Sequence, residues 1–156
     1  MDATARAALI DRYRDGYAAV VAALAGATDA ELDRRAGPEE WTAREVVHHL
    51  ADSEMTSAIR LRRLLVEDDP LIQGYDEAAF ARTLHYGDRP LEASLRALEA
   101  ARATSAEILD RLSDADWSRS GTHSESGPYS VADWLEIYAS HGHDHAEQIR
   151  QALHPH

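Results

Sequence analysis

The 156-residue sequence contains no cysteine. This absence excludes disulfide bonds, thiolate metal ligands and a protein thiol nucleophile. Basic residues are also scarce: the sequence has 16 of them and 28 acidic residues, which gives a formal net charge of −12. No basic cluster interrupts the acidic excess. Nucleic acids and anionic membranes are therefore not expected partners.

Long apolar runs are missing as well. Nowhere do eighteen apolar residues follow one another, and the first residues, MDATAR, lack the basic and apolar regions of a signal peptide. We therefore expect a soluble, cytoplasmic protein. The length suits one domain with its own core, and neither a repeat nor a linker divides the chain. We predict a single domain over residues 1–156.

The residue types that favour strands are sparse, and no stretch alternates apolar with polar residues over a strand's length. Alanine, leucine, arginine and glutamate dominate, so the predicted fold class is all-α. The second long helix should begin with a capping box, Thr42-Ala43-Arg44-Glu45. A long crossover should follow it after Asp68-Asp69-Pro70, which makes a four-helix bundle the simplest architecture. The long helices are expected at about residues 3–24, 42–66, 90–112 and 130–153, with short ones at 28–35 and 76–84.

Several histidines lie on the predicted helices, and a wheel of 100° per residue separates them by direction. His49 lies on the flank of an apolar stripe, whereas His48 points nearly opposite to that stripe. His141 and His145 lie within or beside the inner face of the last helix, whereas His143 lies outside it. Two histidines four residues apart can chelate one ion, and a third from another helix would complete the set. A histidine on an apolar face is also commonly a hydrogen-bonded core residue, so the pattern leaves both interpretations open.

Acidic and amide side chains near these histidines have two interpretations each. Glu54 interrupts the apolar stripe and needs a partner, which could be an arginine on a neighbouring helix, or Glu54 could be a catalytic general base. Asp52, one turn after His49, could orient the imidazole ring or could be a surface acid. Gln148 and Asp144 carry the same ambiguity.

Two apolar side chains, Met55 and Ile59, lie on the outward side of the second long helix together with His48. One exposed apolar residue means little, but two stacked on one helix face indicate a modest interface.

Two segments resemble the signature motifs of the DinB superfamily, and more closely its YfiT-like branch: residues 41–53 (WTAREVVHHLADS) and 141–149 (HGHDHAEQI). Residues 70–77 and His123 also resemble that branch. The resemblance implies a four-helix bundle, often a homodimer, that binds one divalent ion, zinc or nickel, through three histidines. Matched position by position, these would be His49, His141 and His145. The sequence departs from the branch at Glu54, where YfiT-like proteins often have a histidine.

Three functions are compatible with such a site. Because some YfiT-like proteins are linked to low-molecular-weight thiols such as bacillithiol, and related DinB-like proteins to mycothiol, we first expect a thiol S-transferase that joins a small thiol to an electrophile. A divalent ion would deprotonate the thiol, a nucleophile that this cysteine-free chain cannot supply. The second function is a metal-dependent hydrolase in which Glu54 moves protons. The third is a metal-stabilised binding or stress protein without activity.

Overall fold

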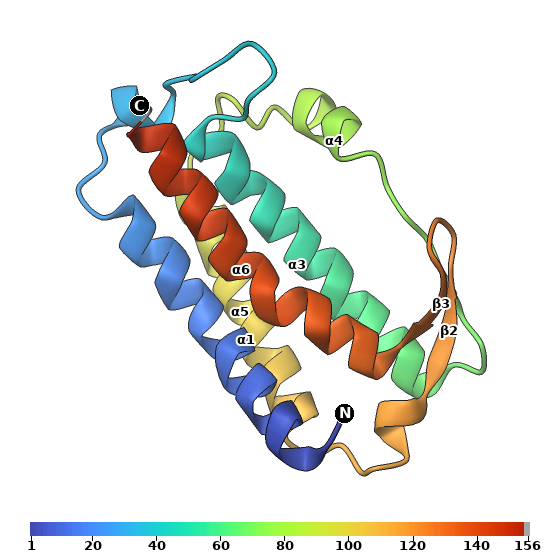
Figure 1. Ribbon diagram of the computed structural model, residues 1–156. Helices are drawn as coiled ribbons and strands as arrows, with labels where there is room; N and C mark the ends of the chain where they lie inside the picture. The colour runs from blue at the N-terminus through green and yellow to red at the C-terminus, as the bar shows by residue number, and fades with distance from the viewer. Residues whose placement is uncertain (155–156) are drawn as a thin grey trace.

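Four long helices lie side by side in the computed structural model, which describes residues 1–154 (Figure 1). The predicted helical bundle with a long crossover is confirmed. One predicted helix is shorter at both ends, since residues 90–112 contain a helix only over Glu92–Leu109. Pro155 and His156, which belong to the predicted domain, lie outside the described residues. The long helices are α1 (Ala3–Leu24), α3 (Ala43–Val66), α5 (Glu92–Leu109) and α6 (Val131–Leu153).

Side-chain caps explain where two of these helices begin. The Thr42 side chain accepts a hydrogen bond from the backbone of Glu45, whose carboxylate accepts one from the Thr42 backbone. This confirms the capping box predicted for the second long helix. Ser130 and Asp133 form the same reciprocal pair at the start of α6. Each box satisfies amides that lack a partner in the first turn.

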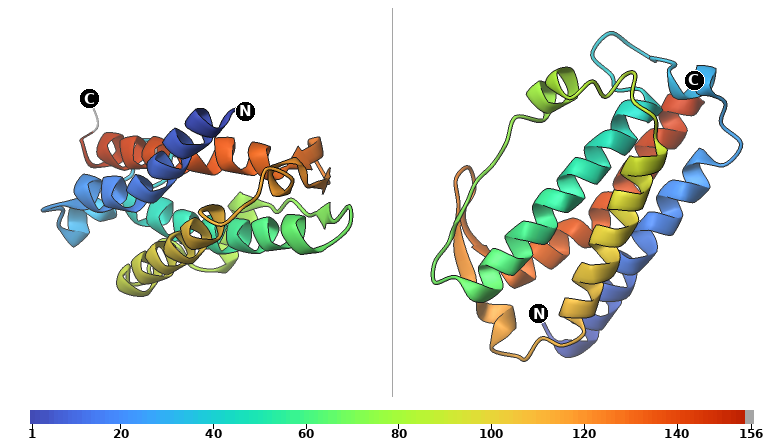
Figure 2. Two further views of the ribbon diagram at one scale, coloured as in Figure 1. Left: turned by 90° about the horizontal axis from the view of Figure 1, so that it is seen from below. Right: turned by 180° about the vertical axis from the view of Figure 1, so that it is seen from behind.

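The helices form a ring in which α1 packs against α5 and α6, and α3 packs against the same two helices. The crossover after α3 returns along the outside of the bundle, so α5 begins at the same end as α3 and runs in the same direction (Figure 2). The short helix α4 (Glu77–Thr83) lies in this crossover, beside the first half of α3. Another short helix, α2 (Asp29–Leu32), lies between α1 and α3. No helix within residues 1–154 has the length and apolar character to cross a bilayer.

A small three-stranded sheet lies beside the end of α3 and the start of α6 (Figure 1), where the sequence predicted only irregular structure. That expectation was wrong. β1 (Leu71–Ile72) pairs in parallel with β2 (Ser120–His123), which pairs antiparallel with β3 (Gly127–Ser130). Strands of two to four residues are too short to show alternation, and their pairing joins segments about fifty residues apart.

The core consists of two apolar clusters with a polar layer between them. Leu50 belongs to one cluster and Leu61 to the other, and between them on α3 lies Glu54, which is buried with Arg102 of α5. Glycines allow the helices to approach closely here. A Cβ added to Gly142 of α6 would lie 3.1 Å from the Cα of Gly16 on α1.

Candidate metal centre

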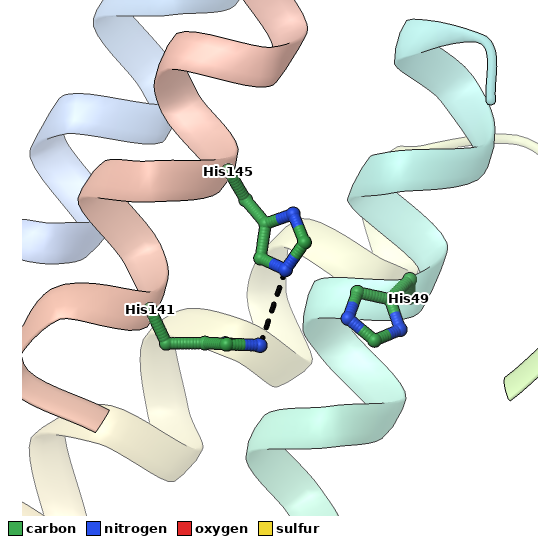
Figure 3. Close-up of side chains that lie close together, drawn as sticks. All are labelled: His49, His141 and His145. Carbon is green, nitrogen blue, oxygen red and sulfur yellow. Dashed lines mark hydrogen bonds between the residues drawn. The ribbon is translucent and has the colours of Figure 1, made fainter. Parts of the chain in front are cut away.

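Three imidazoles meet between α3 and α6 (Figure 3). His141 and His145 project from successive turns of α6, and His49 faces them from α3. The Nε2 atoms of His141 and His145 are 3.1 Å apart. All three residues offer ligand nitrogens within 4.8 Å of one another. The structure therefore brings together the same three histidines that the sequence selected.

The separation and charge state of these rings suit a divalent ion. Two nitrogens that bind one tetrahedral zinc ion at 2.0–2.1 Å lie about 3.3 Å apart. Burial, reinforced by His145, lowers the pKa of His49 to about 4. Burial lowers the pKa of His141 to about 3, with smaller contributions from His145, His49 and Arg102. Both rings are neutral at pH 7, which is the form that binds metal.

A neighbouring amide orients one of the three rings. The Nδ1 of His145 lies 2.7 Å from the Oε1 of Gln148, so Nδ1–H donates to that oxygen. The lone pair of His145 is then on Nε2, the atom that faces His141. Histidine ligands of metals are commonly held by such an acceptor on the other ring nitrogen. Of the two roles left open for Gln148, the contacts support orientation of His145.

Trp41 is a neighbour of the site that the sequence analysis did not select. Its ring lies edge-on to His49, with the two centroids 5.0 Å apart. A pocket of about 450 Å³ adjoins the cluster, and both Trp41 and His145 line it. In the sequence, Trp41 directly precedes the Thr42 cap and is the first residue of the 41–53 segment that resembles the family motif. The pocket provides an approach from solvent to the histidine cluster.

The two other histidines singled out near the site lie outside the cluster. His143 contacts the backbone oxygen of Arg12 through its Nε2, as expected for an outward residue. His48 was expected to point away from the bundle, but it is only 1% exposed. Its ring contacts the Ser94 hydroxyl and the Arg89 backbone oxygen. The expectation failed because the residues that lead into α5 cover this part of α3.

The carboxylates near the site are occupied by other partners. Glu54 is completely buried and accepts hydrogen bonds from Arg102, Tyr13 and Ser57. These contacts confirm the predicted pairing with an arginine on a neighbouring helix, while the general-base role of Glu54 stays a prediction. Asp52 accepts a hydrogen bond from the Tyr86 hydroxyl. The sequence offered the His49 ring as a partner of Asp52, but the structure pairs Asp52 with Tyr86 instead.

Comparison with known proteins identifies relatives of the whole fold. The family model described as the DinB superfamily matches residues 12–149. A protein of Oceanobacillus iheyensis named putative metal-dependent hydrolase OB0782 is 40% identical over 119 residues, which cover 76% of this chain and 69% of that protein. The protein named putative metal-dependent hydrolase YfiT, from Bacillus subtilis, is 33% identical over 125 residues, or 80% and 70% of the two chains. The solved structure of YfiT, described as a probable metal-dependent hydrolase with an unusual four-helix bundle topology, matches with a TM-score of 0.91 at 29% identity. That match covers 97% of this chain and 87% of the other.

Proposed function

This chain belongs to the DinB superfamily, and we propose that it is a metal-dependent hydrolase with His49, His141 and His145 as metal ligands. The observation that carries the proposal is the convergence of three imidazoles, two of them with Nε2 atoms 3.1 Å apart, beside an open pocket. We propose zinc or nickel as the ion, since imidazole suits both. When bound, such an ion acts as a Lewis acid and lowers the pKa of water in its coordination sphere to about 7.

The residues around the cluster have supporting roles in this proposal. Gln148 holds the ring of His145 so that its Nε2 faces the cluster. Trp41 packs against His49, which is 2% exposed, and keeps solvent from that ring. His145 and Gln148 also line the pocket, so a substrate entering there reaches the ligand side of α6. Glu54 is assigned no step, because hydrogen bonds already engage its carboxylate.

The hydrolase replaces our first expectation, the thiol S-transferase, because the related proteins are named as hydrolases. The transferase remains the second candidate. In that function an external thiol would supply the sulfur nucleophile, since the chain contains no cysteine. Both functions use the same three histidines, so the choice between them depends on the nucleophile.

One substrate panel separates the two functions. The protein is stripped with a chelator, reloaded with zinc or nickel, and assayed on esters and amides, and in parallel on electrophiles with small thiols. We expect hydrolysis that requires the metal and no thiol. Turnover that occurs only when a thiol is present would instead establish the transferase. Absence of both activities would favour the metal-stabilised binding protein.

Metal content tests the ligand assignment directly. We expect about one ion per chain in the wild type, and loss of that ion in His49→Ala, His141→Ala and His145→Ala. His143→Ala and His48→Ala are the matched controls and should retain it, although the buried His48 variant should melt at a lower temperature. Full metal retention in any of the first three variants, measured by elemental analysis, would disprove the site.

A further inference from the structure

The pocket beside the three histidines has an acidic wall. Three glutamates, Glu39, Glu40 and Glu77, line it together with His145 and Trp41. Two of the glutamates come from the loop before α3, and the third begins α4, which the crossover carries to the same end of the bundle (Figure 1). The fold therefore gathers carboxylates from separate parts of the chain around the entrance to the proposed metal centre.

Among the residues that the structure describes, no arginine lines this pocket beside the three glutamates. Arginines do line other large pockets, such as Arg44 and Arg89 in one and Arg14 in another. None of the three glutamates forms an ion pair within residues 1–154. Arg35 lies nearby, but it donates to the Glu40 backbone oxygen and pairs with Glu45. The three glutamate carboxylates can therefore interact with a ligand that enters the pocket.

An aromatic ring in the same wall strengthens the preference for a cation. The Trp41 side chain is half-buried, and its ring is packed edge-on to both His49 and Tyr86. It is therefore held in place before any ligand binds. Ammonium groups bind the face of tryptophan through its π electrons, and a carboxylate beside the ring adds a charge interaction. The pocket combines both features within reach of His145.

We propose that the substrate of this site carries a cationic amino group, which lies against Glu39, Glu40, Glu77 and Trp41 while its scissile carbonyl lies at the three histidines. The inference rests on the proposed hydrolase function and adds the chemical class of the substrate. Cationic esters or amides should be preferred over neutral ones, and anionic analogues should be rejected.

Hydroxamates, which chelate metal ions, test the charge preference without catalysis. We would titrate the zinc-loaded protein calorimetrically with three of similar length: 4-aminobutanohydroxamic acid, neutral pentanohydroxamic acid and glutaric monohydroxamic acid. A pair of unit charges about 7 Å apart in water changes affinity by roughly two- to threefold, so three partly screened carboxylates should favour the cation by about five- to tenfold. The preference should shrink as salt is raised, and the anionic compound should bind most weakly.

The triple variant Glu39→Gln, Glu40→Gln, Glu77→Gln should bind the neutral hydroxamate as the wild type does and lose the preference for the cation. A control triple with the same change in net charge, Asp15→Asn, Glu107→Gln, Glu136→Gln, alters exposed acids that do not line the pocket and should keep the preference. Equal wild-type affinities for the cationic and neutral compounds would overturn the inference. So would a preference that survives in the glutamate variant.

Failure of this inference and failure of the proposed function give different results. Hydrolysis of cationic and neutral esters at the same kcat/KM, with equal hydroxamate affinities, would refute the charge preference and leave the hydrolase standing. A cationic preference in binding, without hydrolysis of any ester or amide, would support the charge preference and refute the hydrolase.

Discussion

Removing one half of the buried Glu54–Arg102 ion pair should destabilise the bundle more than replacing both halves. Arg102 Nη1 lies 2.6 Å from Glu54 Oε2, and the two side chains are 3% and 0% exposed. Arg102 also donates to the backbone oxygens of Tyr13 and Tyr138. A single guanidinium from α5 thus contacts α3, α1 and α6 in the middle of the core.

The expected magnitudes follow from these contacts. Arg102→Met leaves the Glu54 carboxylate buried with only hydroxyl partners, and Glu54→Leu leaves a buried guanidinium, so each change should cost about 3–5 kcal/mol. The double variant buries no charge. It loses the donors to two backbone oxygens and the acceptor of the buried Tyr13 hydroxyl, at about 1 kcal/mol each, and should therefore be destabilised by roughly 3 kcal/mol. The double variant should be more stable than either single variant.

Urea titration followed by circular dichroism measures the three free energies of unfolding, and chelator-stripped protein keeps metal binding from shifting them. The exposed pair Arg63–Glu67 on α3 is the control, because solvent screens it and Glu67→Gln should change the free energy of unfolding far less than either core variant. If the double variant loses as much as the two single variants together, the side chains contribute independently. That result would refute the reasoning.

Four further predictions concern the metal, the pH dependence of stability, the surroundings of the metal and assembly. Removal of the metal with a chelator at pH 8 should preserve the helical circular dichroism signal and lower the melting temperature, because the apolar core is sufficient to stabilise the fold. Loss of the helical signal would show that the metal is structural. The lowered pKa values of His49 and His141 mean that both rings are neutral in the folded, metal-free protein. The stability that comes from these neutral rings should be complete above about pH 6.5, the pKa of histidine in the unfolded chain, and should decrease as the pH falls towards 4. Urea titrations at pH 8, 6 and 5 would measure this decrease. Gln148→Leu should weaken zinc binding by about 10- to 100-fold in a competition titration, whereas Gln151→Leu should not. We propose a homodimer whose interface contains Met55 and Ile59, which are 44% and 58% exposed. Light scattering should give the mass of a dimer for the wild type and the mass of a monomer for Ile59→Arg.

Local sequence signals predicted the parts of the fold that depend on neighbouring residues. The predicted capping box at Thr42 marks the start of α3, and the helical spacing of His141 and His145 places both rings on one side of α6. The wheel placed His49 on the correct flank of α3. These properties follow from 3.6 residues per turn and from hydrogen bonds between residues three or four apart, so they are readable without knowledge of the rest of the chain.

Other features depend on which distant segments meet. The sheet joins residues near 71 to residues near 122, His48 is covered by the segment before α5, and the partner of Glu54 is on α5. The acidic pocket likewise needs α4 to return to the loop before α3. The helices, the histidine pair and the resemblance to a family could be read from local sequence signals. The sheet, the burial of His48, the partner of Glu54 and the wall of the pocket could not. Contacts between residues far apart in the chain depend on how the helices pack, and they leave no periodic pattern in the sequence.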